Sequence, residues 1–192
     1  METEERFVYT NAVNIVALLH SGQTRKDKIT PFVVHPLRVS ALVDSYGGDL
    51  EEILAALFHD TVEDVPDFNL LKLHETLMIL HEIHEFDVDK VKNIVVALTK
   101  NKFCKNRKER NNDAIYRILN GGESAILVKL CDTMDNLNDS YVLDSGFLKI
   151  WLDEHIAMLN VFSVCDYTRT GIIDAIVDTI NTVEDIQHRR GI

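Results

Sequence analysis

The sequence predicts an all-α fold, a single domain of about eight to ten helices spanning residues 1–192. Apolar side chains recur three and four positions apart through most of the chain, which is the period of a helix with one buried face. The alternation typical of strands is nearly absent. No repeat or Pro/Gly/Ser-rich linker divides the chain, and its length suits one sizeable core.

The first half of the chain contains three segments with the helical period. Their apolar positions, together with one histidine, are Val13, Val16, Ala17 and His20, then Leu37, Ala41 and Leu42, then Ile53, Leu54, Leu57 and Phe58. Prolines at 31, 36 and 66 lie between periodic segments and are interpreted as punctuation within one domain. Residues 31–34 (PFVV) could pair as a brief extended strand, although they are too short to define a sheet.

The second half continues the pattern in three more segments. They are marked by Val91, Ile94, Val95 and Leu98, then Ile126, Leu130, Met134 and Leu137, then Ile172, Ile176, Ile180 and Val183. The chain from about residue 145 onward carries no motif to which a role can be assigned. The apolar stripe over residues 172–186 either packs on the core or forms a homodimer contact, and the sequence leaves both open.

The composition narrows the class of function. A net charge of -11 argues against general binding to DNA or RNA, because a nucleic-acid backbone would be repelled. A small anionic substrate remains compatible, since a metal and a few cations inside a pocket can outweigh the global field. The acidic N-terminus lacks the pattern of a signal peptide, and three dispersed cysteines suit a reducing compartment. We expect a cytoplasmic protein without a membrane association.

The most informative residues are His59 and Asp60, which end an apolar run in residues 55–64 (AALFHDTVED). An imidazole beside a carboxylate is costly to bury unless a metal or another partner binds both. If the helix continues beyond them, Glu63 lies over His59 and Asp64 over Asp60 at i,i+4 spacing. Alternatively, the two later acids belong to a solvated C-terminal turn.

A second apolar helix, residues 125–136, carries Asp132 one turn before Asn136. If Asp132 faces inward, its carboxylate needs a cation or several donors. The alternative places it on the solvent side with Lys129 as its i,i+3 partner. A further imidazole, His35, precedes Pro36 and by itself would suit a satisfied core histidine. Together with His59, Asp60 and Asp132 it completes a two-nitrogen, two-oxygen set suited to Mn²⁺, Fe²⁺ or Zn²⁺.

These residues stand in five ordered motifs. They are residues 20–26 (HSGQTRK), His35 with Pro36, residues 55–64 (AALFHDTVED), residues 98–100 (LTK), and residues 128–132 (VKLCD) extended to Asn136. The set, within about residues 7–140, resembles the HD-domain metal phosphohydrolases. Within that family it resembles the (p)ppGpp hydrolase domain of bifunctional alarmone enzymes of the stringent response and the stand-alone small alarmone hydrolases.

The resemblance implies a fold, a helical HD-domain bundle, and a set of roles. It implies that His35, His59, Asp60 and Asp132 bind one divalent metal, usually Mn²⁺. Glu63 and Asp64 would then act on the attacking water, with Glu63 as the first choice for the base and Asp64 as the alternative. Arg25, Lys26 and Asn136 would contact the nucleotide. The implied reaction removes the 3′-diphosphate from ppGpp or pppGpp, giving GDP or GTP and pyrophosphate.

The chain departs from the family pattern at two places. One extra residue lies between Arg25 and His35, and residues 133–136 (TMDN) replace the usual RLHN. The second change removes two cationic or titratable groups from beside the expected metal. Two alternatives are therefore kept: an HD-domain nucleotidase acting on another phosphorylated nucleotide, and a module that senses a nucleotide without turnover.

A cluster of cations lies in residues 100–110 (KNKFCKNRKER), which hold six basic residues in an otherwise acidic chain. It is either a loop that meets substrate phosphates or a solvated segment with no binding role.

Overall fold

The computed structural model describes residues 2–140, 145–164 and 171–190. Within these ranges the chain forms helices joined by short connections, so the all-α prediction is confirmed. The helices are α1 (Thr3–Leu19), α2 (Val34–Ser45), α3 (Leu50–Phe58), α4 (Thr61–Asp64), α5 (Leu70–His81), α6 (Val88–Leu98), α7 (Arg107–Asn120), α8 (Gly122–Asn138), α9 (Ser145–Ser163) and α10 (Gly171–Arg190).

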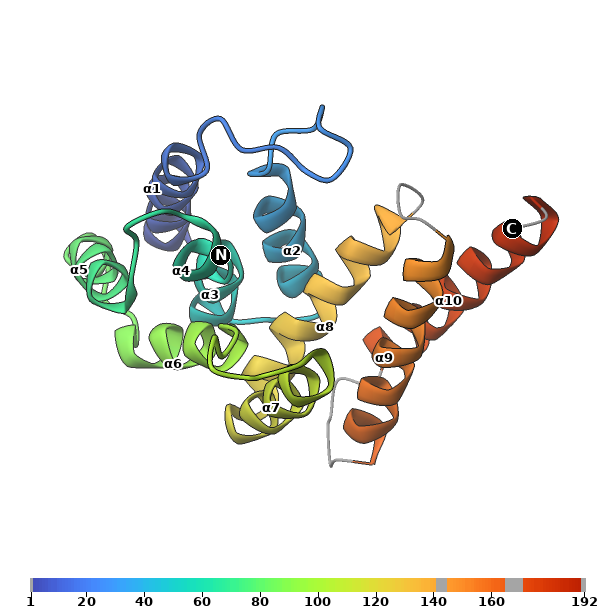
Figure 1. Cartoon of the computed structure of the whole chain (residues 1–192). Coiled ribbons are helices and arrows are strands. Elements are labelled where there is room, and N and C mark those ends of the chain that lie inside the picture. Colours follow the sequence, from blue (N-terminus) through green and yellow to red (C-terminus); the bar gives the residue numbers. More distant parts are fainter. Residues whose placement is uncertain (1, 141–144, 165–170, 191–192) are drawn as a thin grey trace.

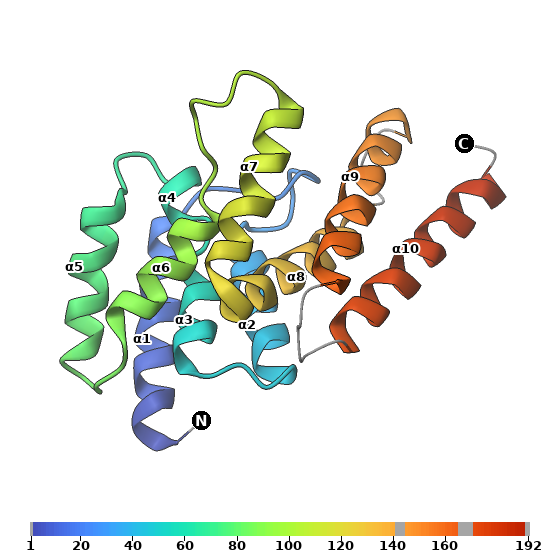
Figure 2. The same ribbon diagram turned by 90° about the horizontal axis from the view of Figure 1, so that it is seen from below.

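Helix α3 lies at the centre of the bundle, in contact with α1, α2, α6 and α8 (Figure 1). Helices α1 and α5 lie side by side at one end of the molecule, and α9 and α10 lie beside α8 at the other (Figure 2). Helix α7 contacts α6, α8 and α9, so it connects the two ends. The central position of α3 matters because the His59–Asp60 pair follows it directly.

Local sequence explains where α3 begins and why it is buried. Asp49 accepts a hydrogen bond from the backbone N–H of Glu52, and Glu52 accepts one from the N–H of Asp49, both at 3.0 Å. This reciprocal capping box satisfies two donors that a helix start otherwise leaves free. Apart from Glu51, every residue of α3 is buried. The helix is therefore a core element with no solvent-facing side.

The chain turns at His59 and Asp60, where the sequence analysis considered a continuous helix. Helix α3 ends at Phe58, and the short helix α4 begins at Thr61. The Thr61 hydroxyl donates to the carbonyl of Phe58 at 2.6 Å, and the backbone N–H of Asp64 donates to the carbonyl of Asp60 at 2.9 Å. The turn thus sets the His59–Asp60 pair at a corner between two helices.

The proline region differs in detail from the prediction. Pro31 forms an isolated antiparallel bridge with Thr24, and α2 already begins at Val34, so no strand forms over residues 31–34. Pro36 lies inside the first turn of α2, not between segments. A proline is tolerated there because the first N–H groups of a helix have no partner within it.

The apolar stripe on α10 packs on the core. Ile172, Ile176 and Ile180 are at most 3% exposed, and α10 contacts α8 and α9. Core packing, one of the two interpretations left open, accounts for these three positions, and the side chain of Ile186 lies outside the described residues.

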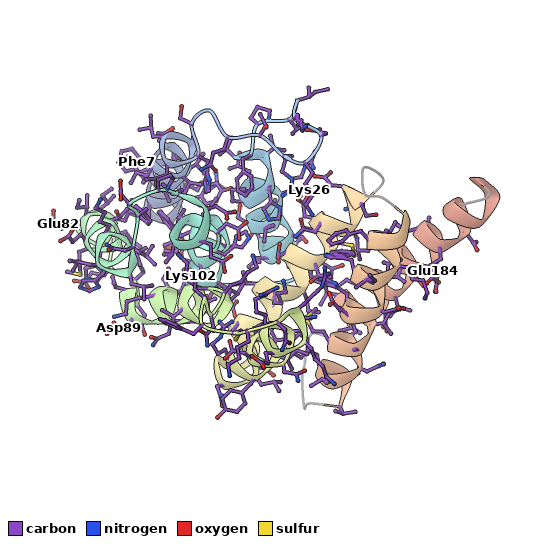
Figure 3. The ribbon with its side chains drawn as sticks, in the orientation of Figure 1. Phe7, Lys26, Glu82, Asp89, Lys102 and Glu184 are labelled. Atoms are coloured by element: carbon purple, nitrogen blue, oxygen red, sulfur yellow. The ribbon has the colours of Figure 1, made fainter. Side chains whose placement is uncertain are left out.

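Charged side chains such as Glu82, Asp89 and Glu184 lie on the outside of the bundle (Figure 3). Among the described helices, none is both long enough and apolar enough to cross a membrane.

Candidate metal centre and its cavity

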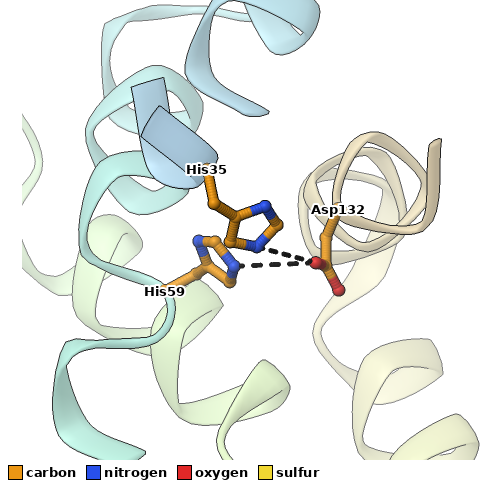
Figure 4. A group of neighbouring side chains, drawn as sticks. All are labelled: His35, His59 and Asp132. Atoms are coloured by element: carbon orange, nitrogen blue, oxygen red, sulfur yellow. Dashed lines mark ion pairs between the residues drawn. The ribbon is translucent and has the colours of Figure 1, made fainter. Parts of the chain in front are cut away.

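Three side chains from three parts of the fold converge on one point. His35 comes from the first turn of α2, His59 from the corner after α3, and Asp132 from α8 (Figure 4). One potential ligand atom from each lies within 4.8 Å of the others, and all three residues are buried. The Asp132 Oδ1 atom is 3.2 Å from His35 Nε2 and 3.8 Å from His59 Nε2.

Asp60 joins the same cluster. Its Oδ2 atom is 3.2 Å from Nε2 of His59 and 3.4 Å from Nε2 of His35, and its side chain is 22% exposed. The structure therefore brings together all four residues expected to bind metal, with Asp60 on the side nearest solvent.

Each imidazole is oriented by a bond to its other nitrogen. Nδ1 of His59 lies 2.7 Å from the carbonyl oxygen of Ala56, and Nδ1 of His35 lies 2.7 Å from Oδ2 of Asp135. A carbonyl or carboxylate oxygen can only accept, so both rings carry their proton on Nδ1 in the neutral form. Both Nε2 lone pairs then point at the carboxylates of Asp60 and Asp132.

This donor set fits a divalent cation. Nε2 of His59 is buried and makes no hydrogen bond to any described residue, although two carboxylates lie within 4 Å. Lone pairs that face carboxylate oxygens repel one another unless a proton or a metal lies between them. Two imidazole nitrogens and two carboxylates form a set that Mn²⁺, Fe²⁺ or Zn²⁺ accepts with positions left for other ligands.

When no metal is bound, protons on the imidazoles of His35 and His59 remove the repulsion between these lone pairs and the carboxylates. Burial lowers the pKa of His35, but hydrogen bonds with Asp132, Asp135 and Asp60 outweigh it and raise this pKa to about 9. The pKa of His59 is also raised, because the attraction of Asp60 and Asp132 exceeds the effect of burial. Burial raises the pKa values of both aspartates, yet nearby cations bring them down, mainly His59 for Asp60 and Lys129 for Asp132.

The two positions considered for Asp132, facing inward or paired with Lys129, are both found in the structure. The carboxylate faces inward, where it is buried, and it also forms the i,i+3 ion pair with Lys129 at 2.8 Å. The two interpretations were alternatives in the sequence, but the two carboxylate oxygens allow both. Oδ1 faces the imidazoles, and Oδ2 faces the lysine.

The acidic pair, Glu63 and Asp64, lies one turn after Asp60 on α4. Glu63 accepts hydrogen bonds from the backbone N–H and the Nζ of Lys100, the latter at 2.7 Å, so both of its oxygens are occupied. The pKa of Asp64 is raised by partial burial and by the charge of Asp60. Both residues line the cavity beside the metal cluster, and both also border a wider cavity of about 760 Å³ along residues 62–71.

Arg25 and Asn136 contact each other next to Asp132. Arg25 Nη2 donates to Asn136 Oδ1 at 3.0 Å, and Asn136 Nδ2 donates to Asp132 Oδ1 at 2.5 Å. Arg25 Nε also donates to Asp139 at 3.0 Å. Lys26 lines the same cavity, and its pKa is lowered by partial burial and by the neighbouring charge of Arg25. All three candidate substrate-binding residues are thus within the site.

The cavity itself has a volume of about 460 Å³. Besides the residues above, its walls include Lys100, Arg107 and Arg110 from the basic segment and Trp151, Glu154 and His155 from α9. Half of the basic segment's cations therefore face the site.

Helix α9, in which the sequence shows no motif, supplies one wall of this cavity. Arg107 forms two hydrogen bonds to Glu154, at 2.6 and 2.7 Å, which join α7 to α9 across the cavity rim. The Trp151 and His155 rings lie 3.9 Å apart. A helical i,i+4 pair of aromatic and imidazole rings was the available signal, but nothing in the sequence places that pair beside the metal.

Comparison with known proteins decides the family. The family model described as "HD domain" matches residues 12–144. The chain belongs to the HD-domain family. Curated HD-domain relatives named guanosine-3′,5′-bis(diphosphate) 3′-pyrophosphohydrolase include a Xenopus tropicalis protein, MESH1, 36% identical over 132 residues. Another, from Aquifex aeolicus, is 34% identical over 125 residues. These alignments cover 67% and 64% of this chain but 66% and 16% of the two relatives.

Solved structures show the same fold. One, titled as a metazoan ortholog of SpoT that hydrolyses ppGpp, superposes with a TM-score of 0.68 at 23% identity, covering 88% of this chain and 93% of that one. A second, lmo0812 from Listeria monocytogenes, has a TM-score of 0.63 at 20% identity and covers 78% of this chain and 92% of that one.

Proposed function

We propose that this HD domain is a metal-dependent hydrolase that removes the 3′-diphosphate from (p)ppGpp, giving GDP or GTP and pyrophosphate. The observation that carries the proposal is the combination, in one cavity, of the metal-binding cluster, the Glu63–Asp64 pair and several cations. The relatives named for this reaction support the choice of substrate.

The metal would be held by His35, His59, Asp60 and Asp132, and we propose Mn²⁺, with Fe²⁺ and Zn²⁺ as alternatives. When bound, such an ion lowers the pKa of water and polarises a phosphoryl oxygen. The protein's own contribution is to present two imidazole lone pairs in fixed directions and to leave the Asp60 side of the cluster open to the cavity.

The Glu63–Asp64 pair supplies the proton acceptor. The sequence favoured Glu63, but the geometry favours Asp64, because both oxygens of Glu63 are bonded to Lys100. A general base also works best when its pKa lies close to neutrality. Asp64 has the raised pKa, so we assign it as proton acceptor and assign Glu63 to the positioning of Lys100.

The cations account for a polyphosphate substrate in a protein of net charge -11. Arg25 and Lys26 come from the connection between α1 and α2, whereas Lys100, Arg107 and Arg110 come from the connection before α7 and from α7 itself, and all five line the cavity. A nucleotide with phosphates on both sides of its ribose would reach both groups. We assign Arg25 and Asn136, which are hydrogen-bonded to each other at the cavity wall, to contacts with the ribose or base.

The decisive experiment is incubation of the purified protein with Mn²⁺ and ppGpp, followed by anion-exchange separation of products. We expect GDP and pyrophosphate, and neither product with the Asp60→Asn variant. GTP, dGMP and NADPH are offered in parallel. If one of them loses phosphate while ppGpp stays intact, the nucleotidase alternative replaces this proposal; if the protein binds ppGpp and Mn²⁺ without turnover of any substrate, the sensing module replaces it.

The cytoplasmic location and the homodimer remain predictions from the sequence. Small phosphorylated nucleotides are the only partners that the site itself suggests among the described residues.

A further inference from the structure

The segment after Asp132 holds the largest departure from the family pattern, and one of its residues is buried against the metal cluster. Asp135 stands where the family usually has histidine, and it is 2% exposed. The sequence analysis treated this segment as a loss of titratable groups. The structure instead shows a carboxylate directed from α8 toward His35.

Asp135 has three charged neighbours. Its Oδ2 atom lies 2.7 Å from Nδ1 of His35 and 3.8 Å from Nη2 of Arg25. Its Oδ1 atom lies 3.7 Å from Nη1 of Arg38. Because a buried carboxylate is costly unless it is paired, the two nearby guanidinium groups help to stabilise Asp135 in this position. The shortest of the three contacts of Asp135 is the one with the imidazole of His35.

We propose that Asp135 is a positioning residue for the metal site. It holds the proton of His35 on Nδ1, so that the Nε2 lone pair faces the cluster, and its negative charge makes this imidazole a stronger ligand. A carboxylate behind a metal-binding histidine has both effects in metalloproteins generally. The proposal rests on the proposed metal site, but it does not depend on which nucleotide is hydrolysed.

The two imidazoles of the site provide an internal contrast. His59 is oriented by a neutral backbone carbonyl, that of Ala56, which any residue at position 56 would provide. His35 is oriented by a charged side chain one hundred positions away. Only the second arrangement can be tuned by substitution, so the chain's unusual residue at 135 lies where a side chain controls metal affinity.

The test is metal binding without nucleotide, using two variants of different chemistry. Asp135→Asn keeps an oxygen acceptor and removes the charge, and we expect Mn²⁺, followed by EPR titration, to bind about 10-fold more weakly. Asp135→Leu removes the acceptor as well, and we expect a loss of about 100-fold. Thermal melting of both variants without metal shows whether they remain folded.

Asp139→Asn is the matched control. Asp139 directly follows the last residue of α8 and pairs with the same two arginines, Arg25 at 3.0 Å and Arg38 at 3.4 Å. The substitution removes one carboxylate from the same cluster without touching His35. We expect Mn²⁺ affinity to stay within about twofold of the parent, because a more distant charge is better screened.

A spectroscopic measurement separates positioning from general structure. In the Zn²⁺-loaded protein, ¹⁵N NMR should show the His35 ring protonated at Nδ1, with its signal assigned by the His35→Gln variant. In Asp135→Asn this tautomer should persist, and in Asp135→Leu the Nδ1 proton should exchange faster. The proposal is overturned if Asp135→Asn binds Mn²⁺ as tightly as the parent, or if Asp139→Asn loses as much affinity. Absence of ppGpp hydrolysis, by contrast, would affect only the substrate assignment.

Discussion

Two histidines line the same cavity, and their pKa values are shifted in opposite directions. The carboxylates around His35, in the metal cluster, raise its pKa to about 9. His155, on α9, has its pKa lowered to about 4 by burial and by the charge of Lys129. The environment of His35 is therefore strongly negative, whereas that of His155 is less negative and more shielded from water.

The difference shows that the two walls of the cavity have different electrostatic environments. In the function proposed above, the wall with His35, His59, Asp60 and Asp132 would hold a cation, and the wall with Lys100, Arg107 and Arg110 would hold phosphate. A divalent metal at the first wall would add positive charge there and would strengthen the attraction for a substrate that carries phosphates. The following predictions test whether these two walls have separate roles.

Loss of a metal ligand should have the largest effect. Asp132→Asn removes a carboxylate from the cluster, and we expect hydrolysis to fall by more than about 100-fold, the upper range for residues that merely support a ligand. Mn²⁺ binding should weaken in parallel, as measured by titration. Full activity after this change, or after treatment with a chelator, would contradict a metal-dependent mechanism.

Loss of the proton acceptor should lower turnover while leaving metal bound. We expect Asp64→Asn to reduce kcat by about 10²- to 10⁴-fold, the range for general base catalysis, with Mn²⁺ affinity unchanged. Steady-state kinetics at saturating Mn²⁺ provide the measurement. Glu82→Gln, at an exposed position on the outside of the bundle, is the control. A larger loss in Glu63→Gln than in Asp64→Asn would restore Glu63 as the base.

Loss of a cation from the phosphate-binding wall should mainly raise KM. Arg110 lines the cavity and Lys108 does not, although both are exposed cations in the same segment. We expect Arg110→Ala to raise KM about 10-fold, the value of one charged hydrogen bond, and Lys108→Ala to leave it nearly unchanged. Equal effects of the two variants would indicate that only the overall charge of the segment matters.

The pH dependence of stability should reveal the environment of His155. The unfolded chain takes up a proton at this residue near pH 6.5, whereas the folded chain does so only near 4, so stability is lost as the pH falls between these values. Asp132 and Glu154 oppose the shift but do not cancel it. Between pH 7 and pH 5, we expect the His155→Gln variant to lose about 1 to 2 kcal/mol less of its free energy of unfolding than the parent protein. Melting temperatures of the two proteins between pH 7 and pH 5 would show it, and parallel curves would refute it.

The sequence singled out the four residues that the structure brings together at the candidate metal centre, but it did not single out most residues of the second wall. His35, His59, Asp60 and Asp132 stand in compact motifs beside apolar runs, where burial of a polar group needs a partner. The helices themselves follow from the spacing of apolar residues, and α3 and α8 are buried as that spacing predicts.

What the sequence could not provide was the packing of distant elements. In the sequence Asp135 is one more polar residue of the α8 segment, and only the folded structure shows that it contacts His35. Trp151 and His155 lie on a helix without a motif, and their place at the cavity depends on how α9 packs against α7. The break after Phe58 was also missed, because a turn of two residues in helical conformation leaves the apolar period intact.

The burial of every residue of α3 except Glu51 limits how this protein can change over time. Substitutions in a helix buried on nearly every side disturb its packing, and the His59–Asp60 pair that follows it would shift with the helix. The exposed parts of α7 and of the connection before it can vary at much lower cost in stability. New substrate preferences should therefore arise by changes in the basic segment and α9, while α3 and the corner at His59 and Asp60 stay constant.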